Sequence, residues 1–169
     1  DAAYGFDACG RGDTLVLSTS GFPAGSGPDR AEGRRGRLYG LMEDLHRRAA
    51  ETARAVSPEA WIRLATPYSD NAGFLAAGIP AQVITVLPHA EASALLGYIG
   101  KSGSDTDRLA RVITGNKPLE QDDPLGPVIP ETWKLLHTER DNAASLTASA
   151  FTLIESFLSA LAARMDPAP

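Results

Sequence analysis

The sequence predicts an α/β fold in which a mixed, mostly parallel sheet is flanked by helices, and three observations support this prediction. Short apolar segments with strand character recur along the chain; they are residues 2–9, 14–19, 61–65 and 81–87. Residues 37–56 and 142–165 repeat apolar side chains at three- and four-residue spacing, which is typical of amphipathic helices. A short helical segment links the last two strands, and a strand–helix–strand unit of this kind is typical of a parallel crossover.

The composition limits the class of partner. The chain has 169 residues, of which 43% are hydrophobic and 22% charged, as expected of a single packed domain that spans 1–169. The net charge of -5 leaves no general basic face and argues against a nucleic-acid partner. No apolar run approaches the ~20 residues of a membrane span. Cys9 is the single cysteine, so no internal disulfide is possible.

The first strand ends close to a carboxylate. Residues 2–9 are short, apolar and aromatic, and the glycine turn Cys9-Gly-Arg-Gly-Asp13 stops them. Asp7 lies near the end of this strand, where a carboxylate is costly unless it is paired, hydrogen-bonded or bound to a metal. Asp7 is therefore either a cap of the glycine turn or a metal ligand. The second strand, 14–19, should run antiparallel to the first because the connection is short.

A glycine- and arginine-rich segment precedes the first long helix. Residues 21–36 contain no large apolar residue after Phe22 and predict a mobile surface loop. The helix 37–56 carries charged residues opposite its apolar stripe. His46 stands among charged residues, so we expect it to be exposed and chemically inert. The apolar stripe consists of Leu38, Leu41, Met42, Leu45, Ala49, Ala53 and Val56.

The segment 66–80 joins two strands and carries a second carboxylate. Ser69 or Asp70 can cap a short helix that continues to Ala77, and Gly78 then ends it. In a parallel crossover, the groups that follow the C-terminal end of a strand face the binding crevice. Asp70 is therefore expected near any active site, where it faces the substrate or supports the site. A helix-capping role is compatible with that position.

Residues 88–130 form a long, less regular stretch that predicts an insertion or a lid. Helical character returns at 90–100 and 106–114, and the end of the stretch is rich in proline and acidic residues. His89 follows the strand 81–87 and is a candidate for the crevice.

A histidine lies at the junction between an expected strand end and the closing helix. The stretch Trp133–Asp141 contains His137, one of three histidines in the chain, and the helix 142–165 follows it. A strand-to-helix junction is a usual position for a metal ligand or a catalytic base. The alternative is a histidine that is hydrogen-bonded within its own loop.

Three separated stretches together resemble the zinc aminopeptidase and glutamate carboxypeptidase family of co-catalytic metallopeptidases. Tyr4-Gly-Phe-Asp-Ala-Cys-Gly10 is similar to the strand of that family that ends in Asp-x-x-Gly. Tyr68-Ser-Asp-Asn-Ala-Gly-Phe-Leu-Ala-Ala-Gly-Ile-Pro80 is similar to its Ser-Asp-His-x-x-Phe…Gly-Ile-Pro signature, and Leu136-His-Thr-Glu-Arg-Asp141 to its His-Thr-x-x-Asp segment. Order, spacing and element type agree from residue 4 to about residue 160. The resemblance implies a three-layer α/β sandwich of the phosphorylase/hydrolase-like type, which animal glutaminyl cyclases share.

The resemblance also implies roles for three residues. Asp7 falls on the carboxylate that ligates one zinc ion, His137 on the histidine that ligates the other, and Asp70 on an acidic residue beside the site. Zinc accepts imidazole and carboxylate ligands and keeps a position open for water. A pair of ions polarises the scissile carbonyl of a peptide substrate and lowers the pKa of that water. The resemblance also implies an extracytoplasmic or secreted location for this chain.

The sequence departs from the family in motifs that activity requires. The family's bridging carboxylate comes from a His-x-Asp, and its general base and a further ligand come from a Glu-Glu pair; this sequence contains neither motif. Asn71 replaces the usual histidine, and Leu136 stands where some members carry a tyrosine. The chain is therefore expected to be the C-terminal half of a zinc exopeptidase domain, with no catalytic residue of its own. The alternatives are a peptidase-like binding module that does not catalyse and a glutaminyl cyclase-like acyltransfer enzyme.

An incomplete domain has a consequence for association. A sheet that lacks its first strands exposes an edge and an apolar face. We therefore expect the chain to associate with its missing N-terminal half or with a second copy of itself.

Overall fold

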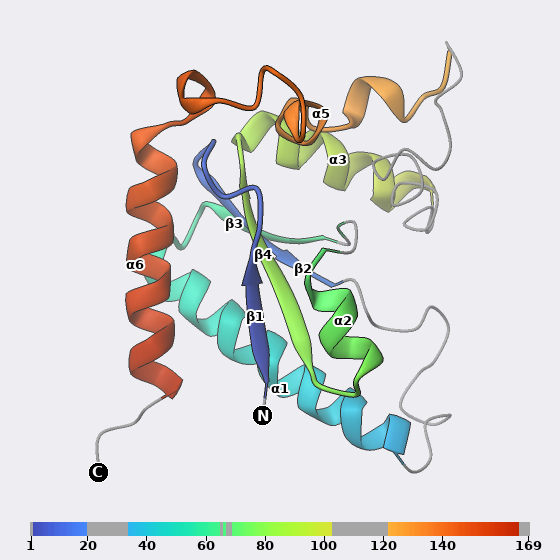
Figure 1. Ribbon diagram of the computed structural model, residues 1–169, viewed down its shortest axis with the longest axis vertical. Coiled ribbons are helices and arrows are strands. Elements are labelled where there is room, and N and C mark those ends of the chain that lie inside the picture. The colour runs from blue at the N-terminus through green and yellow to red at the C-terminus, as the bar shows by residue number, and fades with distance from the viewer. Residues whose placement is uncertain (1, 20–33, 65, 67–68, 103–121, 166–169) are drawn as a thin grey trace.

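The computed structural model describes residues 2–19, 34–64, 66, 69–102 and 122–165. These residues form an α/β fold around a four-stranded mixed sheet (Figure 1). The strands are β1 (Ala3–Phe6), β2 (Thr14–Ser18), β3 (Trp61–Leu64) and β4 (Ala81–Leu87), and their order in the sheet is β1-β4-β2-β3. The predicted α/β fold with a mixed sheet is confirmed.

β4 lies inside the sheet, between β1 and β2. β1 runs parallel to β4, β2 runs antiparallel to β4, and β3 runs parallel to β2. β1 and β2 therefore run in opposite directions, as predicted, although β4 separates them. The predicted parallel crossover from β3 to β4 is wrong, because β4 runs opposite to β3 and β2 lies between them. All seven residues of β4 are buried. A position inside the sheet suits such a strand, because neighbouring strands cover its edges and helices cover its faces.

Helices cover both faces of the sheet. α1 (Arg34–Val56) and α6 (Ala148–Met165) pack on one face (Figure 1). The buried residues of this core are Leu15, Leu17, Ala49, Ala53, Ile84, Val86, Ala150, Phe157 and Leu161. α3 (His89–Ser102), the 3-10 helix η2 (Gly126–Val128) and α5 (Glu131–Leu135) pack on the other face. The buried residues there are Val16, Leu64, Leu87, Ala92, Leu95, Leu125, Ile129 and Trp133. Successive residues of β2 thus serve opposite cores, as the alternation of side chains along a strand requires.

Two shorter elements complete the described chain. α2 (Asn71–Ala76) packs beside β1 and β4, and the 3-10 helix η3 (Ala143–Ser145) precedes α6. The helix predicted for 142–165 is therefore interrupted before Ala148. At that point the backbone N–H of Thr147 donates to Gly10 O, so it anchors the chain to the turn after β1 instead of continuing a helix.

Helix boundaries differ from the prediction at two further places. α1 begins at Arg34, since arginine is a good helix former, so the end of the predicted loop 21–36 is helical; residues 20–33 lie outside the described residues. Trp133 lies in α5 rather than at a strand end, because its backbone N–H donates to Pro130 O at 3.0 Å and closes a helical turn. None of the helices in the described part of the chain combines the length and the apolar character that a membrane span requires.

The segment 88–130 contributes to the core at both of its described ends. α3 confirms the helix predicted at 90–100, whereas the helix predicted at 106–114 lies outside the described residues. Ala92 of α3 and Leu125, just before η2, are buried. The ends of the predicted insertion or lid are therefore part of the packed domain.

Candidate functional site

Asp7 follows β1 and contacts the segment that precedes α2. Its backbone N–H donates to Ile84 O at 3.1 Å, which extends the β1–β4 ladder by one residue. Its side chain is exposed, and Ser69 Oγ donates to Asp7 Oδ2 at 2.6 Å. The first two of the three family-like stretches therefore meet, although 62 positions separate these residues. The bond engages one carboxylate oxygen, and the other can accept a further donor or ligate a cation.

The turn after Asp7 is held by backbone and side-chain contacts. Ala8 adopts a left-handed φ of 52°, and its carbonyl oxygen accepts a hydrogen bond from Thr85 Oγ1 at 3.0 Å. Cys9 Sγ donates to the carbonyl oxygens of Asp7 (3.4 Å) and Ile84 (3.3 Å). Burial, and then the charge of Asp7, raise the pKa of the Cys9 thiol to about 12. The thiol is therefore protonated at neutral pH and is not a reactive nucleophile.

Asp70 lies beside this contact but does not cap α2. It occupies the N-cap position with helical φ and ψ of -55° and -24°, and its side chain makes no capping hydrogen bond. Instead, Asn71 Oδ1 accepts the backbone N–H of Ser69 at 3.0 Å, and Asn71 is 1% exposed. Gly78, with a φ of 77°, follows the helix as predicted. The predicted capping role of Asp70 is wrong, and its exposed carboxylate adjoins the residue that bonds Asp7.

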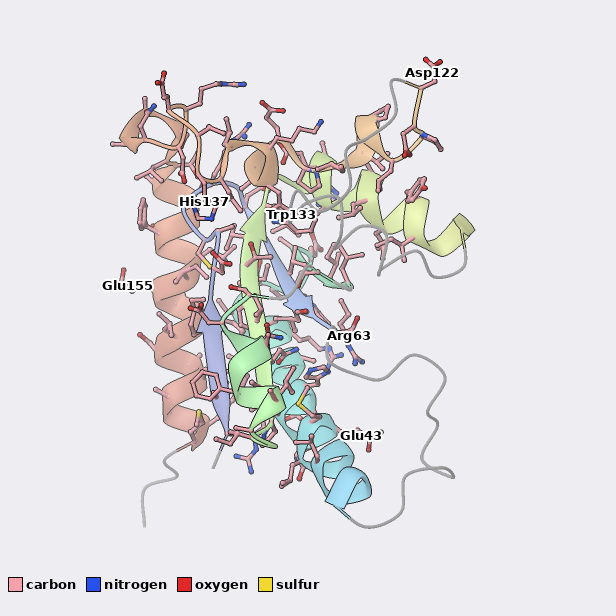
Figure 2. All side chains as sticks on the ribbon, turned by 45° about the vertical axis from the view of Figure 1, so that its right-hand side comes forward. Glu43, Arg63, Asp122, Trp133, His137 and Glu155 are labelled. Atoms are coloured by element: carbon pink, nitrogen blue, oxygen red, sulfur yellow. The ribbon has the colours of Figure 1, made fainter. Side chains whose placement is uncertain are left out.

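His137 lies in the loop between α5 and η3 and is exposed. Its backbone adopts a φ of 62°, which is uncommon for a residue other than glycine, and its N–H donates to Asp141 Oδ2 at 3.2 Å. Figure 2 shows His137 at the end of the molecule where β1 and β4 finish. The same connection reaches the turn after β1 where Thr147 N–H donates to Gly10 O at 2.9 Å. This contact links the turn that follows Asp7 to the end of the connection that contains His137.

Asp7 and His137 are the types of residue that bind zinc, but two ligands are too few for a zinc site. A carboxylate and an imidazole are both zinc ligands, and a structural or catalytic site takes at least three protein ligands. Among the residues that the structure describes, no three histidine, cysteine, aspartate or glutamate side chains form a group that could hold a metal ion. Asp7 and His137 therefore need additional ligands to make a zinc site.

His89 opens α3, and its imidazole faces two hydroxyl groups. Nδ1 lies 3.4 Å from Thr14 Oγ1, and Nε2 lies 3.4 Å from Ser93 Oγ. The backbone N–H of His89 donates to Asp13 Oδ1 at 2.9 Å. These contacts join the start of β2 to the start of α3. His89 therefore has a structural role in the fold.

The prediction that His46 is exposed is wrong. Its side chain is 3% exposed, because residue 46 continues the helical stripe formed by Met42, Ala49 and Ala53. Burial, and then the charge of Arg63, lower the pKa of His46 from the ordinary 6.5 to about 4. The helical spacing along α1 indicated that His46 is buried, but the charged residues next to it in the sequence obscured this pattern.

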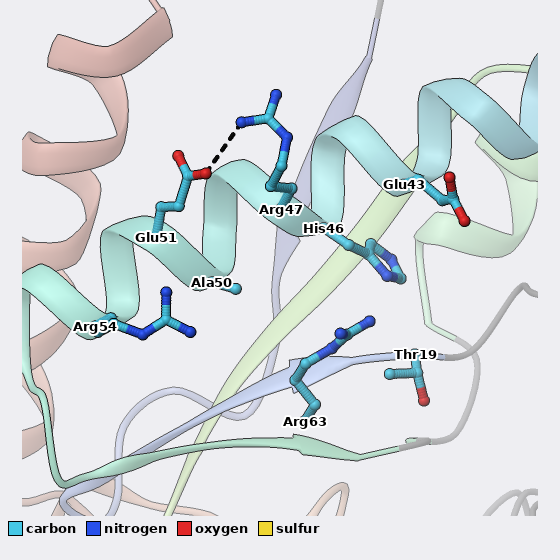
Figure 3. Close-up of a pocket in the computed structure, with 8 residues that line it drawn as sticks. All are labelled: Thr19, Glu43, His46, Arg47, Ala50, Glu51, Arg54 and Arg63. Carbon is cyan, nitrogen blue, oxygen red and sulfur yellow. Dashed lines mark hydrogen bonds and ion pairs between the residues drawn. The ribbon is translucent and has the colours of Figure 1, made fainter.

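His46 lines a hollow of about 650 Å³ between α1 and the neighbouring strands β2 and β3 (Figure 3). Three arginines, two glutamates, Ala50 and Thr19 complete the lining. Asp7, Asp70 and His137 do not contribute to it. The hollow is therefore a site separate from the predicted metal ligands, and sequence reasoning missed it.

Stability should fall between pH 6.5 and pH 4 because His46 is buried without charge. The pKa of His46 is about 4 in the folded chain and 6.5 in the unfolded chain, so the unfolded chain binds the proton first as the pH falls. The stabilisation is fully present above pH 6.5, is lost as the pH falls through 4, and amounts to about 3 kcal/mol. Urea unfolding between pH 6.5 and pH 4 measures this loss. In His46→Leu, the free energy of unfolding should no longer show the loss that His46 causes and should keep the pH dependence that carboxylates cause. Parallel stability curves for the two proteins would contradict the prediction.

Comparison of the chain with models of known protein families, with curated proteins and with solved structures gave no match in any of the three. The candidate functions therefore depend on the residues themselves, namely the Asp7–Ser69 contact, His137 and the arginine-lined hollow.

Proposed function

We propose that this chain is the C-terminal half of a zinc-dependent exopeptidase domain, which hydrolyses peptide bonds with metal-activated water and uses Asp7 and His137 as zinc ligands. The observation that carries the proposal is the 2.6 Å hydrogen bond from Ser69 Oγ to Asp7 Oδ2. It joins two stretches that resemble the same metallopeptidase family and that are distant in the sequence. Such a contact is expected if both stretches line one site, and nothing requires it if each resemblance is accidental.

The proposed roles follow from the chemistry of four side chains. Asp7 and His137 are exposed and offer a carboxylate oxygen and an imidazole nitrogen, both of which zinc accepts. Ser69 holds one oxygen of Asp7 and thereby orients the other, as groups behind metal ligands commonly do. The exposed carboxylate of Asp70 suits the positively charged amino group of a peptide end. When bound, zinc would polarise the scissile carbonyl and acidify a water molecule.

The remaining ligands and the general base are proposed to come from a preceding half of the domain. β1 is an edge strand of the described sheet, and its four residues are half-buried. A further strand could pair with its outer side, and a second copy of the chain is the alternative occupant. Size-exclusion chromatography with light scattering should show association. A well-behaved monomer at high concentration would count against this part of the proposal.

Zinc titration of the reconstituted domain tests the ligand assignment. The chain is combined with the segment encoded upstream of Asp1, and zinc affinity is measured by competition with a chelator. Asp7→Ala and His137→Ala should each lower the affinity by more than about 100-fold, because loss of a ligand costs at least as much as loss of the groups behind it. Ser69→Ala should cost about 10–100-fold. Hydrolysis of an aminoacyl anilide should disappear in both ligand variants.

Asp122→Ala is the matched control for these variants. Asp122 is exposed, and Figure 2 shows it at a corner of the molecule far from His137. Zinc affinity should be the same as in the unmodified chain. Unchanged zinc uptake in Asp7→Ala or in His137→Ala would show that the assignment of that ligand is wrong.

A peptidase-like binding module without catalytic activity is the second candidate. The observation that favours it is Asn71, which stands where the family has a histidine, is 1% exposed and accepts the N–H of Ser69. A side chain buried in this way does not meet a substrate. The upstream sequence separates the two candidates, since a His-x-Asp followed by a Glu-Glu pair favours the enzyme and their absence favours the module.

A further inference from the structure

The hollow beside α1 contains one arginine whose charge is already balanced. Arg47 donates to Glu51 Oε1 at 3.0 Å and to Asp44 Oδ1 at 3.2 Å. Glu51 Oε2 also lies 3.7 Å from Arg164. Figure 3 shows the Arg47–Glu51 pair pointing away from Arg63. This pair therefore contributes little net charge to the interior of the hollow.

The other two arginines that line the hollow are Arg54 and Arg63. In the part of the chain that the structure describes, neither of them makes an ion pair. Figure 3 shows them on either side of Ala50, which also lines the hollow. Glu43 lies beyond His46, away from Arg54. Positive charge is thus concentrated between Arg54 and Arg63.

The fold places both exposed arginines at the hollow, and a ring contact orients one of them. The Arg54 guanidinium lies over the Trp61 ring, 5.3 Å from its centroid, and a stacked guanidinium keeps its edge N–H donors available. Arg63 belongs to β3, where it pairs with Leu17 of β2. The charge of Arg63 reaches the buried His46, whose pKa it helps to lower. Donors that are positioned before binding lose less conformational entropy when a ligand arrives.

We propose that this hollow binds a doubly charged phosphate group, either free phosphate or a small phosphomonoester, between Arg54 and Arg63. Guanidinium groups bind phosphate oxygens through two parallel charge-assisted hydrogen bonds. Two arginine charges match a dianion, whereas chloride or a monocarboxylate leaves one of them unbalanced. The volume of about 650 Å³ is within the usual range of small-molecule sites and leaves room for the organic part of a monoester.

A phosphate titration followed by amide NMR tests the proposal. It is run at constant ionic strength with a chelator present, so that neither general screening nor bound metal contributes. Phosphate should cause saturable shifts of the amides around Arg54 in α1 and Arg63 in β3, and chloride at the same ionic strength should not. Arg54→Gln and Arg63→Gln should each weaken binding about tenfold or more. Absence of saturable shifts, or unchanged affinity in both variants, would overturn the proposal.

Two controls keep the test decisive. Arg140→Gln removes an exposed arginine that pairs with Glu131 at 3.1 Å, outside the hollow, and should bind phosphate as the unmodified chain does. Arg54→Lys keeps the charge over Trp61 and removes the planar fork, so it should also bind more weakly. It replaces Arg54→Gln if that variant does not fold.

Three ligands identify the source of the phosphate group. Tighter binding of glycerol phosphate than of inorganic phosphate would assign a phosphomonoester. Equal or weaker binding of glycerol phosphate would assign the free ion. Succinate is a dianion without a phosphate group, and succinate binding as tight as that of phosphate would overturn the assignment to phosphate.

Discussion

Replacing Phe157 by alanine should lower the free energy of unfolding by about 3–5 kcal/mol, the usual cost of removing a buried aromatic side chain. Phe157 is fully buried and is the largest of the fully buried side chains in the described residues. Its ring lies 6.3 Å from that of Phe6 in an edge arrangement with an interplanar angle of 64°. The side chain therefore connects α6 to β1 as well as filling the core that α1 shares.

Urea unfolding followed by circular dichroism measures this loss, and the same helix provides the control. Phe151 is 54% exposed, so Phe151→Ala should change the free energy of unfolding by no more than about 0.5 kcal/mol. Similar losses in Phe157→Ala and Phe151→Ala would contradict the placement of α6 on the sheet.

Replacing Gly12 by alanine should destabilise the chain by about 4 kcal/mol, from strain of about 1–3 kcal/mol and overpacking of about 1–3 kcal/mol. Gly12 has a φ of 117°, a conformation that residues with a side chain rarely adopt. A Cβ at this position would lie 2.2 Å from the carbonyl carbon of Leu87 and 2.5 Å from Pro88 N. Backbone atoms of β4 cannot move away cheaply, because β4 pairs with a strand on each side.

The close approach at Gly12 follows from the strand order. β1 and β2 flank β4, so the connection between them must cross the end of β4. Gly12 N–H donates to Thr147 Oγ1 at 3.0 Å, and its carbonyl oxygen accepts from Ser149 Oγ at 3.0 Å. This crossing therefore also holds the start of α6, and Gly12→Ala should disturb the end of the sheet that carries Asp7 and His137.

Gly97→Ala in α3 is the matched control for Gly12→Ala. A Cβ at Gly97 meets no atom within 4 Å, and alanine favours a helix interior over glycine by about 0.5–1 kcal/mol. Thermal unfolding should therefore show a small gain in Gly97→Ala and a large loss in Gly12→Ala. Equal stability of the two variants would rule out the crossing described for Gly12.

Local patterns in the sequence were enough to identify most of the elements. The apolar run of β4 and the repeating spacing of α1 and α6 each depend on which side chains a strand or helix buries, which is a property of the segment itself. The same logic failed where the local pattern was ambiguous. Trp133 and Leu135 alternate like a strand, but the turn that opens at Pro130 makes this segment a helix.

The resemblance of three short stretches identified Asp7, Asp70 and His137 as candidate site residues. It did not predict which side chains are in contact. Ser69 was one of two candidates for a helix cap, and it is the residue that bonds Asp7. Arg54 and Arg63 gave no signal in the sequence. They lie on a helix and on an edge strand whose faces meet only in the folded chain.

By itself, the sequence determined that this chain is an α/β protein, where its long helices lie, and that it carries Asp7 and His137 near the ends of apolar segments. Only the tertiary structure decided the strand order β1-β4-β2-β3, the burial of His46, the contact between Ser69 and Asp7, and the position of Arg54 and Arg63 in the lining of one hollow. The physical reason is that burial periodicity is local to each segment. Strand pairing and side-chain contacts instead depend on which distant segments compete for the same buried position. β4 takes the place inside the sheet because five of its seven residues are apolar, and its two polar residues, Gln82 and Thr85, donate hydrogen bonds to backbone carbonyl groups.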